Sequence, residues 1–159
     1  MMGITTQIRP AVPQDMPHLI ALAELEYNMF EIDDPFSPEI CERYIYMMMK
    51  DPDGCAIVLV DERNIPFGYL AGSLDFSQMN SKPQAITHHW FVHNPRQVYG
   101  RHKYGLQLIN TFERWAQTKG ATVSLVGIQM NAGQRRAYDR VFGRMGYDAN
   151  CVYYKKRIR

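Results

Sequence analysis

The sequence has little cysteine, no metal-binding pattern and no long apolar run, and each absence excludes a class of protein. Only three cysteines, Cys41, Cys55 and Cys151, occur among 159 residues, at spacings that do not match a zinc site. An odd number of widely spaced cysteines favours reduced thiols, so we expect a cytoplasmic protein that binds no metal. No apolar run approaches the ~20 residues that cross a bilayer, and the first residues lack a signal-peptide pattern, so we expect no membrane association.

An excess of charge of either sign is also missing. The chain has 18 lysines and arginines against 16 aspartates and glutamates, and its net charge of +2 is too small to indicate nucleic-acid binding. The basic run from Lys155 to Arg159 is short and typical of a solvated chain end. Hydrophobic and charged contents of 46% and 21% are ordinary for a globular protein. We therefore predict a single domain over residues 1–159 with one buried core.

Apolar periodicity and turn residues predict an alternation of strands and helices. We expect strands at 4–9, 55–60, 67–76, 85–92, 122–130 and 150–158, and helices at 15–27, 37–49, 105–120 and 131–145. The strand at 122–130 is expected to be fully buried. This order of elements predicts a mixed sheet flanked by helices.

The most informative segment is the expected helix that Gly105 opens and Gly120 ends. Apolar residues recur in it every three or four positions, at Leu108, Ile109, Phe112, Trp115 and Ala116. A basic stretch, residues 100–104, precedes it. Free amides, the positive end of the helix dipole and fixed cations would converge there, which suits a phosphate group. The alternative is an ordinary solvated connection.

Four segments resemble the Gcn5-related N-acetyltransferases (GNAT), in the order that this family has them. Ile8 to Asp15 is similar to the family's first strand and turn, and Phe67 to Gly72 to its glycine-bearing third strand. Gly105 to Ala121 resembles the acetyl-coenzyme A segment. Asn131, followed by a helix that ends in Phe142 to Tyr147, resembles the final motif. The resemblance covers essentially the whole chain.

The resemblance implies a GNAT fold and an acetyl transfer activity. The fold would be a mixed α/β structure, with a mostly antiparallel sheet of about six to seven strands, about four helices and a splayed strand pair that holds acetyl-CoA. The implied enzyme moves an acetyl group from the thioester to a primary amine by direct attack in a ternary complex. One alternative is a non-catalytic relative that binds an acyl-CoA or a protein partner. A nucleic-acid-binding protein that uses the basic loop and tail is a third reading.

The resemblance also places coenzyme A. The pantetheine would pair with the fourth strand, which is splayed away from the strand at 122–130, and the pyrophosphate would lie against the backbone amides of residues 101–106. The implied cofactor-binding residues are Phe91, Val92, Gly100, Arg101, His102, Lys103, Tyr104, Gly105, Leu106 and Asn131.

Two residues are candidates for proton transfer. Some members of the family carry a histidine at the spacing from Val92 that selects His88, and its neighbour His89 is expected to point to the opposite face of the strand. The family's usual tyrosine acid is replaced here by Phe142, so Tyr138, one turn earlier on the same face, is the candidate acid. A buried histidine satisfied by backbone groups and a packing tyrosine are the alternatives.

The acceptor would lie against the first two helices and their connection, as in the family. Tyr27, Phe30 and Glu31 are the candidate substrate-binding residues, because a carboxylate and aromatic rings suit a cationic amine with an apolar body. A charged helix end in solvent is the alternative. The run from Met47 to Met49 offers either an adaptable surface or core packing, with core packing expected for at least two of its residues. The acceptor is a small-molecule or protein amine, and the family's habit implies a possible homodimer.

Overall fold

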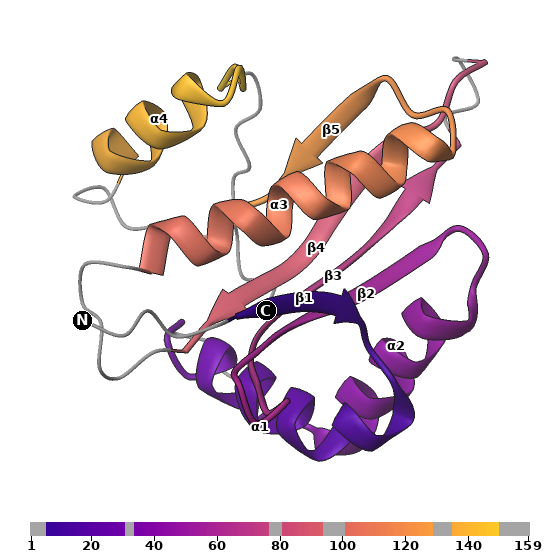
Figure 1. Ribbon diagram of the computed structural model, residues 1–159, viewed down its shortest axis with the longest axis vertical. Helices are drawn as coiled ribbons and strands as arrows, with labels where there is room; N and C mark the ends of the chain where they lie inside the picture. The colour runs from indigo at the N-terminus through magenta and orange to yellow at the C-terminus, as the bar shows by residue number, and fades with distance from the viewer. Residues whose placement is uncertain (1–5, 31–33, 77–80, 94–100, 129–134, 150–159) are drawn as a thin grey trace, which may run out of the picture. The chain divides into compact units, whose positions relative to one another are not determined.

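A computed structural model describes residues 6–30, 34–76, 81–93, 101–128 and 135–149, with Arg101 and His102 described by their backbone alone. The chain divides into two compact units, Met1–Gly127 and Ile128–Arg159. The first unit holds the sheet and most of the helices (Figure 1).

The sheet of the first unit has five strands in the order in which they occur in the chain (Figure 1). They are β1 (Gln7–Pro10), β2 (Gly54–Val60), β3 (Pro66–Asp75), β4 (Gln84–Val92) and β5 (Val123–Val126). The first three pairings are antiparallel, and β5 joins β4 in parallel. The predicted fold class, a mixed and mostly antiparallel sheet with helices, is confirmed. The sheet has five strands rather than six to seven within the described residues, and the predicted strand at 150–158 lies outside them.

Three helices of the first unit pack on the sheet: α1 (Met16–Tyr27), α2 (Pro38–Lys50) and α3 (Arg101–Thr118). A short 3-10 turn, η1 (Pro13–Asp15), leads into α1. The side chain of Ser37 caps α2 by accepting a hydrogen bond from the Ile40 amide at 3.3 Å, as its position before Pro38 predicts. Helix α3 ends before Gly120, which has a φ of 84° and gives the expected glycine stop.

The core has two parts, because successive residues of a strand point to opposite faces of the sheet. Tyr69 and Ala71 belong to the cluster packed under α1 and α2. Leu70 and Gly72 therefore face the other side, where α3 lies. A Cβ atom at Gly72 would come within 2.8 Å of the Phe112 ring, so this glycine is what lets α3 approach β3 closely.

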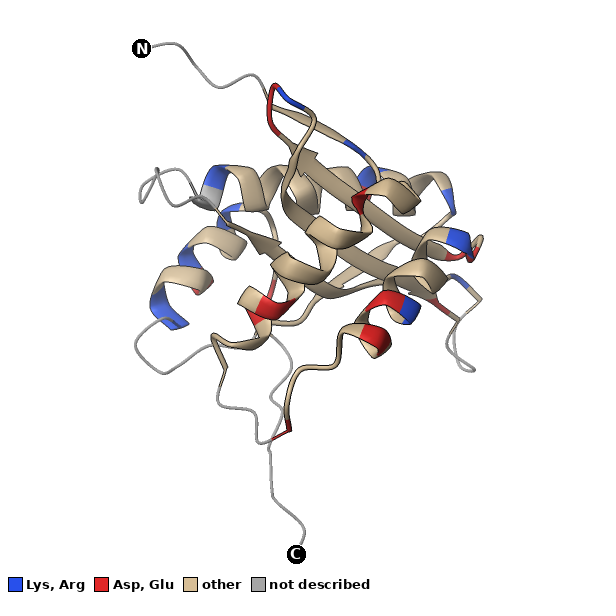
Figure 2. Ribbon diagram, turned by 90° about the horizontal axis from the view of Figure 1, so that it is seen from below, with Lys and Arg blue, Asp and Glu red and all other residues tan. Residues whose placement is uncertain are grey.

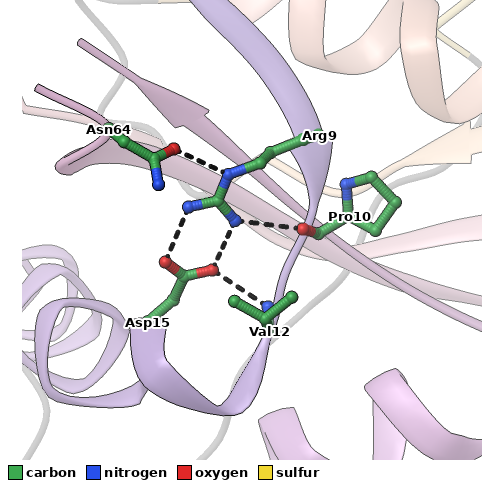
Figure 3. Close-up of polar contacts among 5 residues, drawn as sticks. All are labelled: Arg9, Pro10, Val12, Asp15 and Asn64. Atoms are coloured by element: carbon green, nitrogen blue, oxygen red, sulfur yellow. Dashed lines mark hydrogen bonds and ion pairs between the residues drawn. The ribbon is translucent and has the colours of Figure 1, made fainter. Parts of the chain in front are cut away.

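The link between β1 and α1 is held by an ion pair (Figure 3). The Arg9 guanidinium donates to both carboxylate oxygens of Asp15, at 2.7 and 2.9 Å, and the Val12 amide donates to the same carboxylate at 2.9 Å. Arg9 also donates to the Asn64 side chain at 2.9 Å. Asp15 is 4% exposed, and burial alone would raise its pKa. The hydrogen bonds from Arg9 and Val12 outweigh burial, and the pKa of Asp15 is lowered.

Two predictions about the second half of this unit are wrong in detail. Helix α3 begins at Arg101 rather than at Gly105, so the stretch expected to be a basic loop forms the first turn of the helix from Arg101 on. Strand β5 is short, and none of its residues is fully buried, whereas a long buried strand was expected. Strand β5 lies at the end of the described sheet with a strand partner on one side only, and Val123 is 44% exposed.

The second unit contains α4 (Arg135–Arg144). Its C-terminal end is closed by Gly146, which has a φ of 86°, and by a hydrogen bond of 3.0 Å from the Tyr147 amide to the Phe142 carbonyl. The rings of Tyr138 and Phe142 are one turn apart with centroids separated by 6.4 Å, which confirms that they share one side of the helix. In the parts of the chain that the model describes, no helix is long and apolar enough to cross a membrane.

Candidate active site

An irregularity in the pairing of β3 with β4 brings two histidines to one side of the sheet. Ala71 pairs with His89, but the next residue of β3, Gly72, pairs with Thr87, so His88 is an extra residue on β4. Such a bulge resets the alternation of side chains. Both histidine rings lie against helix α2, as their contacts show. The expectation that the two histidines point to opposite faces is therefore wrong, since simple alternation does not hold across a bulge.

His88 is held by one side chain on each ring nitrogen. The Tyr44 hydroxyl of α2 lies 2.7 Å from its Nδ1 atom, and the Ser73 hydroxyl of β3 lies 3.1 Å from its Nε2 atom. The ring is thus fixed by side chains rather than by backbone groups, and the residue is exposed rather than buried. Partial burial, and then the nearby charge of His89, lower the pKa of His88. His88 is consequently neutral at neutral pH and able to accept a proton.

A second polar group lies beside the first. The carboxylate of Glu26 on α1 accepts a short hydrogen bond from the Tyr69 hydroxyl on β3. Its other oxygen lies 3.7 Å from Nδ1 of His89. The Tyr44 ring contacts both histidines, stacked on His88 at 6.0 Å and edge-on to His89 at 5.6 Å between centroids. Tyr44 therefore joins the two groups.

The tyrosines and the cysteine of this site all remain protonated. Burial, reinforced by the negative charge of Glu26, raises the pKa of Tyr44 and of Tyr69 well above that of a free phenol. The same two causes raise the pKa of the Cys41 thiol to about 11. Both hydroxyls are therefore neutral hydrogen-bonding groups, and Cys41 is not a thiolate nucleophile at neutral pH.

Sequence reasoning selected His88 but missed the side chains that hold it. A signal for Glu26 was present, because it follows Leu19 by seven residues and Ala23 by three, and so occupies the core-facing side of α1. A carboxylate on an apolar helix face needs a partner. Tyr44 similarly stands beside the buried Ile45 on α2. Nothing in the local sequence indicates Ser73, because its contact depends on the bulge.

The edge of β4 that faces β5 is open beyond its first residues. Strand β5 pairs with β4 only from Gln84 to Thr87, within the ranges described. The His93 amide donates to the Phe67 carbonyl at 2.8 Å, so it points toward β3. Since successive amides of a strand point in opposite directions, the N–H of Val92 faces the open edge and that of Phe91 faces β3. Of these two predicted pantetheine contacts, only Val92 presents its N–H to the open edge.

The start of α3 lies close behind this strand in the sequence. In a helix that begins at Arg101, the amides of residues 101–103 have no partner within the helix, whereas those of Gly105 and Leu106 do. A Cβ atom at Gly105 would come within 2.6 Å of the Trp90 ring, so this glycine allows α3 to pack on β4. Fewer backbone amides are therefore available to an anion than those of residues 101–106, which were predicted to bind the pyrophosphate. Lys103 is exposed at this end.

Two other predicted residues make contacts of their own. The Tyr104 ring packs edge-on against Phe67, with centroids 5.7 Å apart. Tyr27, expected in the acceptor site, donates its hydroxyl hydrogen to the Asp34 carbonyl at 2.6 Å and packs on Phe36 at 5.5 Å. Tyr27 thus fastens the end of α1 to the chain that precedes α2. Met48 and Met49 pack in or against the core, as expected for two of the three methionines.

Of the remaining predicted residues, one is described in the first unit. Phe30 lies just after α1, its amide bonded to the Tyr27 carbonyl at 3.1 Å. Glu31, Gly100 and Asn131 lie outside the described residues. Tyr138 belongs to the second unit. Among the residues described, no group of three or more metal-binding side chains is present.

Comparisons with known proteins place this arrangement in a family. No curated protein sequence matches the chain significantly. Solved structures match nearly the whole length of the chain. An aminoglycoside acetyltransferase from an uncultured soil metagenomic sample, in complex with sisomicin, is 21% identical over 97% of each chain, with a TM-score of 0.67. Aminoglycoside N-acetyltransferase AAC(6')-Iy in complex with CoA is 16% identical over 98% of this chain and 97% of that one, with a TM-score of 0.69.

A GNAT family acetyltransferase from Staphylococcus aureus is 13% identical over 97% of this chain and 99% of that one, with a TM-score of 0.68. Identities this low show a shared fold and leave the substrate open. The sequence model of the acetyltransferase (GNAT) family matches residues 19–143, which is most of the chain and includes both histidines. With the fold and the family model in agreement, the chain belongs to the GNAT acetyltransferase family.

Proposed function

We propose that this protein is an acetyl-CoA-dependent N-acetyltransferase of small primary amines, with its active site on the α1 and α2 side of β4. The observation that carries the proposal is the position of a neutral, doubly hydrogen-bonded histidine, His88, on the strand whose edge is open from that residue onward. Acetyl-CoA would supply the acetyl thioester. The residues of the chain would hold it, orient the amine and accept the amine's proton.

The residues present fit coenzyme A. The N–H of Val92 faces the open edge of β4 and is a donor for an extended amide chain such as pantetheine. The hydroxyl of Thr87, buried where β5 leaves β4, has no hydrogen-bond partner within the described part of the chain. The amides of residues 101–103 at the start of α3 suit a pyrophosphate. Gly100, His102 and Asn131 stay proposed cofactor contacts from the family resemblance.

The amine proton would reach His88 through Ser73. Both ring nitrogens of His88 have partners, so a substrate cannot approach either of them directly. With the proton of the neutral ring on Nδ1, facing Tyr44, Nε2 accepts the hydroxyl proton of Ser73. Ser73 can then take a proton from the amine as it passes its own to His88, which leaves the amine neutral and nucleophilic.

Tyr138 is the proposed acid that returns a proton to the departing thiolate. Its support is local to α4, where Phe142 occupies the position of the family's usual tyrosine and the Tyr138 ring contacts it at 6.4 Å. A phenol, unlike a phenyl ring, carries a transferable proton. The single domain over residues 1–159 is part of the same proposal, since it joins Tyr138 to the site.

A small-molecule acceptor is supported by the side chains around the histidines. Tyr44, Tyr69 and Glu26 offer two neutral aromatic hydroxyls and one carboxylate, and they contact the two histidines or one another. Such a set suits an amine that carries positive charge. The structural neighbour solved with sisomicin supports the same class of acceptor.

Cofactor binding can be tested by thermal melting with acetyl-CoA. A ligand that binds only the folded state raises the melting temperature. At a hundredfold excess over its Kd, it adds about 2.7 kcal/mol to the free energy of unfolding. Val92→Pro removes the N–H at the open edge without touching a bond to β3, so it should fold and lose most of the shift. Val92→Ala keeps the N–H and should retain it. A normal shift in the folded proline variant would contradict this placement.

Catalysis can be tested with a panel of amines, following release of the free thiol. His88→Gln and Ser73→Ala should each lower kcat by about 100- to 10,000-fold with acetyl-CoA binding intact. His18→Gln, an exposed histidine on α1, is the matched control. Because the pKa of His88 is lowered, the acidic limb of kcat/KM should lie below ~6.5 and vanish in His88→Gln. Acetyl-CoA binding without turnover of any amine would instead favour a non-catalytic member of the family.

A further inference from the structure

Glu26 has hydrogen-bonding capacity that the described residues do not fill. One carboxylate oxygen accepts the Tyr69 hydroxyl, while the other lies 3.7 Å from the nearest nitrogen of His89, which is too far for a hydrogen bond. An ionised carboxylate can accept about four hydrogen bonds. Its side chain is 15% exposed, so a small molecule can reach it while bulk water is largely kept away.

The charge of Glu26 also has no lysine or arginine partner in the described part of the chain. Tyr69 from β3, and Tyr44 and Cys41 from α2, are neutral because their pKa values are raised. The imidazole of His89 from β4 lies 3.7 Å from the second oxygen. Among the described residues, no lysine or arginine nitrogen lies within 4.0 Å of this carboxylate. Helix α1 carries Glu24 and Glu26 and no lysine or arginine. Figure 2 colours the lysines and arginines of the described chain blue and its aspartates and glutamates red.

Tyr44 interacts both with the proposed proton path and with the surroundings of the Glu26 carboxylate. Its hydroxyl bonds to His88, its ring touches His89 edge-on, and the charge of Glu26 is close enough to raise its pKa. The His88–Ser73 pair and Glu26 are therefore separate polar groups, and Tyr44 contacts the histidine beside each of them. A molecule with two amino groups could place one at Ser73 and the other at Glu26, with its carbon chain along the ring.

We propose that Glu26 binds a second ammonium group of the acceptor, so that the preferred substrates are small diamines or polyamines rather than monoamines. The identity of the reacting amine rests on the proposed function, whereas the ammonium site at Glu26 stands on the contacts of that residue. Tyr69 acts as a positioning residue, because its hydroxyl occupies one oxygen and leaves the other directed to the ligand.

The test compares butane-1,4-diamine with butylamine, which has the same carbon chain and no second amino group. Wild-type protein should acetylate the diamine with the higher kcat/KM. Glu26→Gln keeps an acceptor for the Tyr69 hydroxyl but removes the charge, and it should lower the diamine-to-monoamine ratio of kcat/KM by about 10- to 100-fold. Glu24→Gln, an exposed glutamate on the same helix, should leave the ratio unchanged. An unchanged ratio in Glu26→Gln would overturn the proposal.

Calorimetric binding of butane-1,4-diamine without acetyl-CoA separates this inference from the proposed function. Binding that Glu26→Gln abolishes, in a protein that acetylates no amine, would sustain the ammonium site and reject the enzyme. Acetylation of both amines with equal efficiency would reject the ammonium site and sustain the enzyme. Should Glu26→Gln fail to fold, Tyr69→Phe keeps the charge but removes the hydroxyl that orients it, so it should lower the diamine-to-monoamine ratio of kcat/KM, and an unchanged ratio would overturn the positioning role. His89→Gln removes the imidazole nearest the second oxygen and should strengthen diamine binding.

Discussion

Two partly or fully buried carboxylates, Asp15 and Glu26, lie at opposite ends of α1, and their surroundings differ. Asp15 is 4% exposed and receives two hydrogen bonds from Arg9 and one from the Val12 amide (Figure 3). Glu26 receives one hydrogen bond from Tyr69 among the described residues, and Nδ1 of His89 stands 3.7 Å away. Both oxygens of Asp15 thus accept hydrogen bonds, whereas one oxygen of Glu26 accepts none from a described residue.

The donors around a buried carboxylate distinguish one that stabilises the fold from one that can bind a ligand. A buried charge is tolerated when every lone pair has a donor, and removing one partner is then costly. A carboxylate with unfilled acceptor positions contributes less to the fold and can exchange water for a ligand. By this criterion Asp15 fastens β1 to α1, and Glu26 belongs to the site. Four predictions test the comparison.

The largest expected effect is on stability. Asp15→Asn leaves the Arg9 guanidinium without its anion and should lower the free energy of unfolding by about 3 kcal/mol, the lower end for a broken buried pair, because the Arg9 side chain is 19% exposed. Glu26→Gln should cost about 1 kcal/mol. Urea unfolding of both variants measures the difference. Equal losses would remove the distinction between the two carboxylates.

A smaller effect is expected from Arg9→Lys. Lysine keeps the positive charge but cannot form the two parallel hydrogen bonds to Asp15 or reach Asn64 at the same time. We expect a loss of about 1–2 kcal/mol in the free energy of unfolding. If Arg9→Lys kept the wild-type free energy of unfolding, a positive charge without the planar guanidinium group would be enough to hold β1 to α1.

Acid should act on Asp15 through its lowered pKa. The folded-state pKa lies below the unfolded value of ~3.9, so Asp15 favours the folded state above that value. This contribution is lost as the pH falls through the folded-state pKa. Asp15→Asn should therefore show a flatter loss of stability below about pH 4 than the wild type, measured as melting temperature against pH. Parallel curves would contradict the assigned shift.

The smallest effect is expected for the interaction between Glu26 and His89. A double-mutant cycle of Glu26→Gln with His89→Gln should give a coupling energy below about 1 kcal/mol, because the His89 side chain is 52% exposed and the pair is not hydrogen-bonded. The matching cycle at Arg9 and Asp15 should give a clearly larger coupling. A strong coupling between Glu26 and His89 would mean that the carboxylate is already satisfied and would weaken its role as an ammonium site.

Local sequence was enough to place one end of each of two helices. The Ser37-Pro38 pair marks the start of α2, and Gly120 marks the end of α3, because caps and glycine stops depend on a few neighbouring residues. His88 was selected through a family spacing rather than through its surroundings. The start of α3 was misplaced because Gly105 was read as a turn residue, although it lies inside the helix, against Trp90.

Local patterns of apolar, turn and capping residues were sufficient to predict the mixed α/β class, the order of the elements as far as α4 and the motifs of the family. That His88 and His89 share one face depends on tertiary structure, because a single extra residue in β4 breaks the alternation that sequence reasoning assumes. The same is true of the hydrogen bonds that each carboxylate accepts. Arg9 and Asp15 are six residues apart, whereas Glu26 meets Tyr69 across 43 residues of chain, and contacts of that range are formed by packing rather than by local sequence.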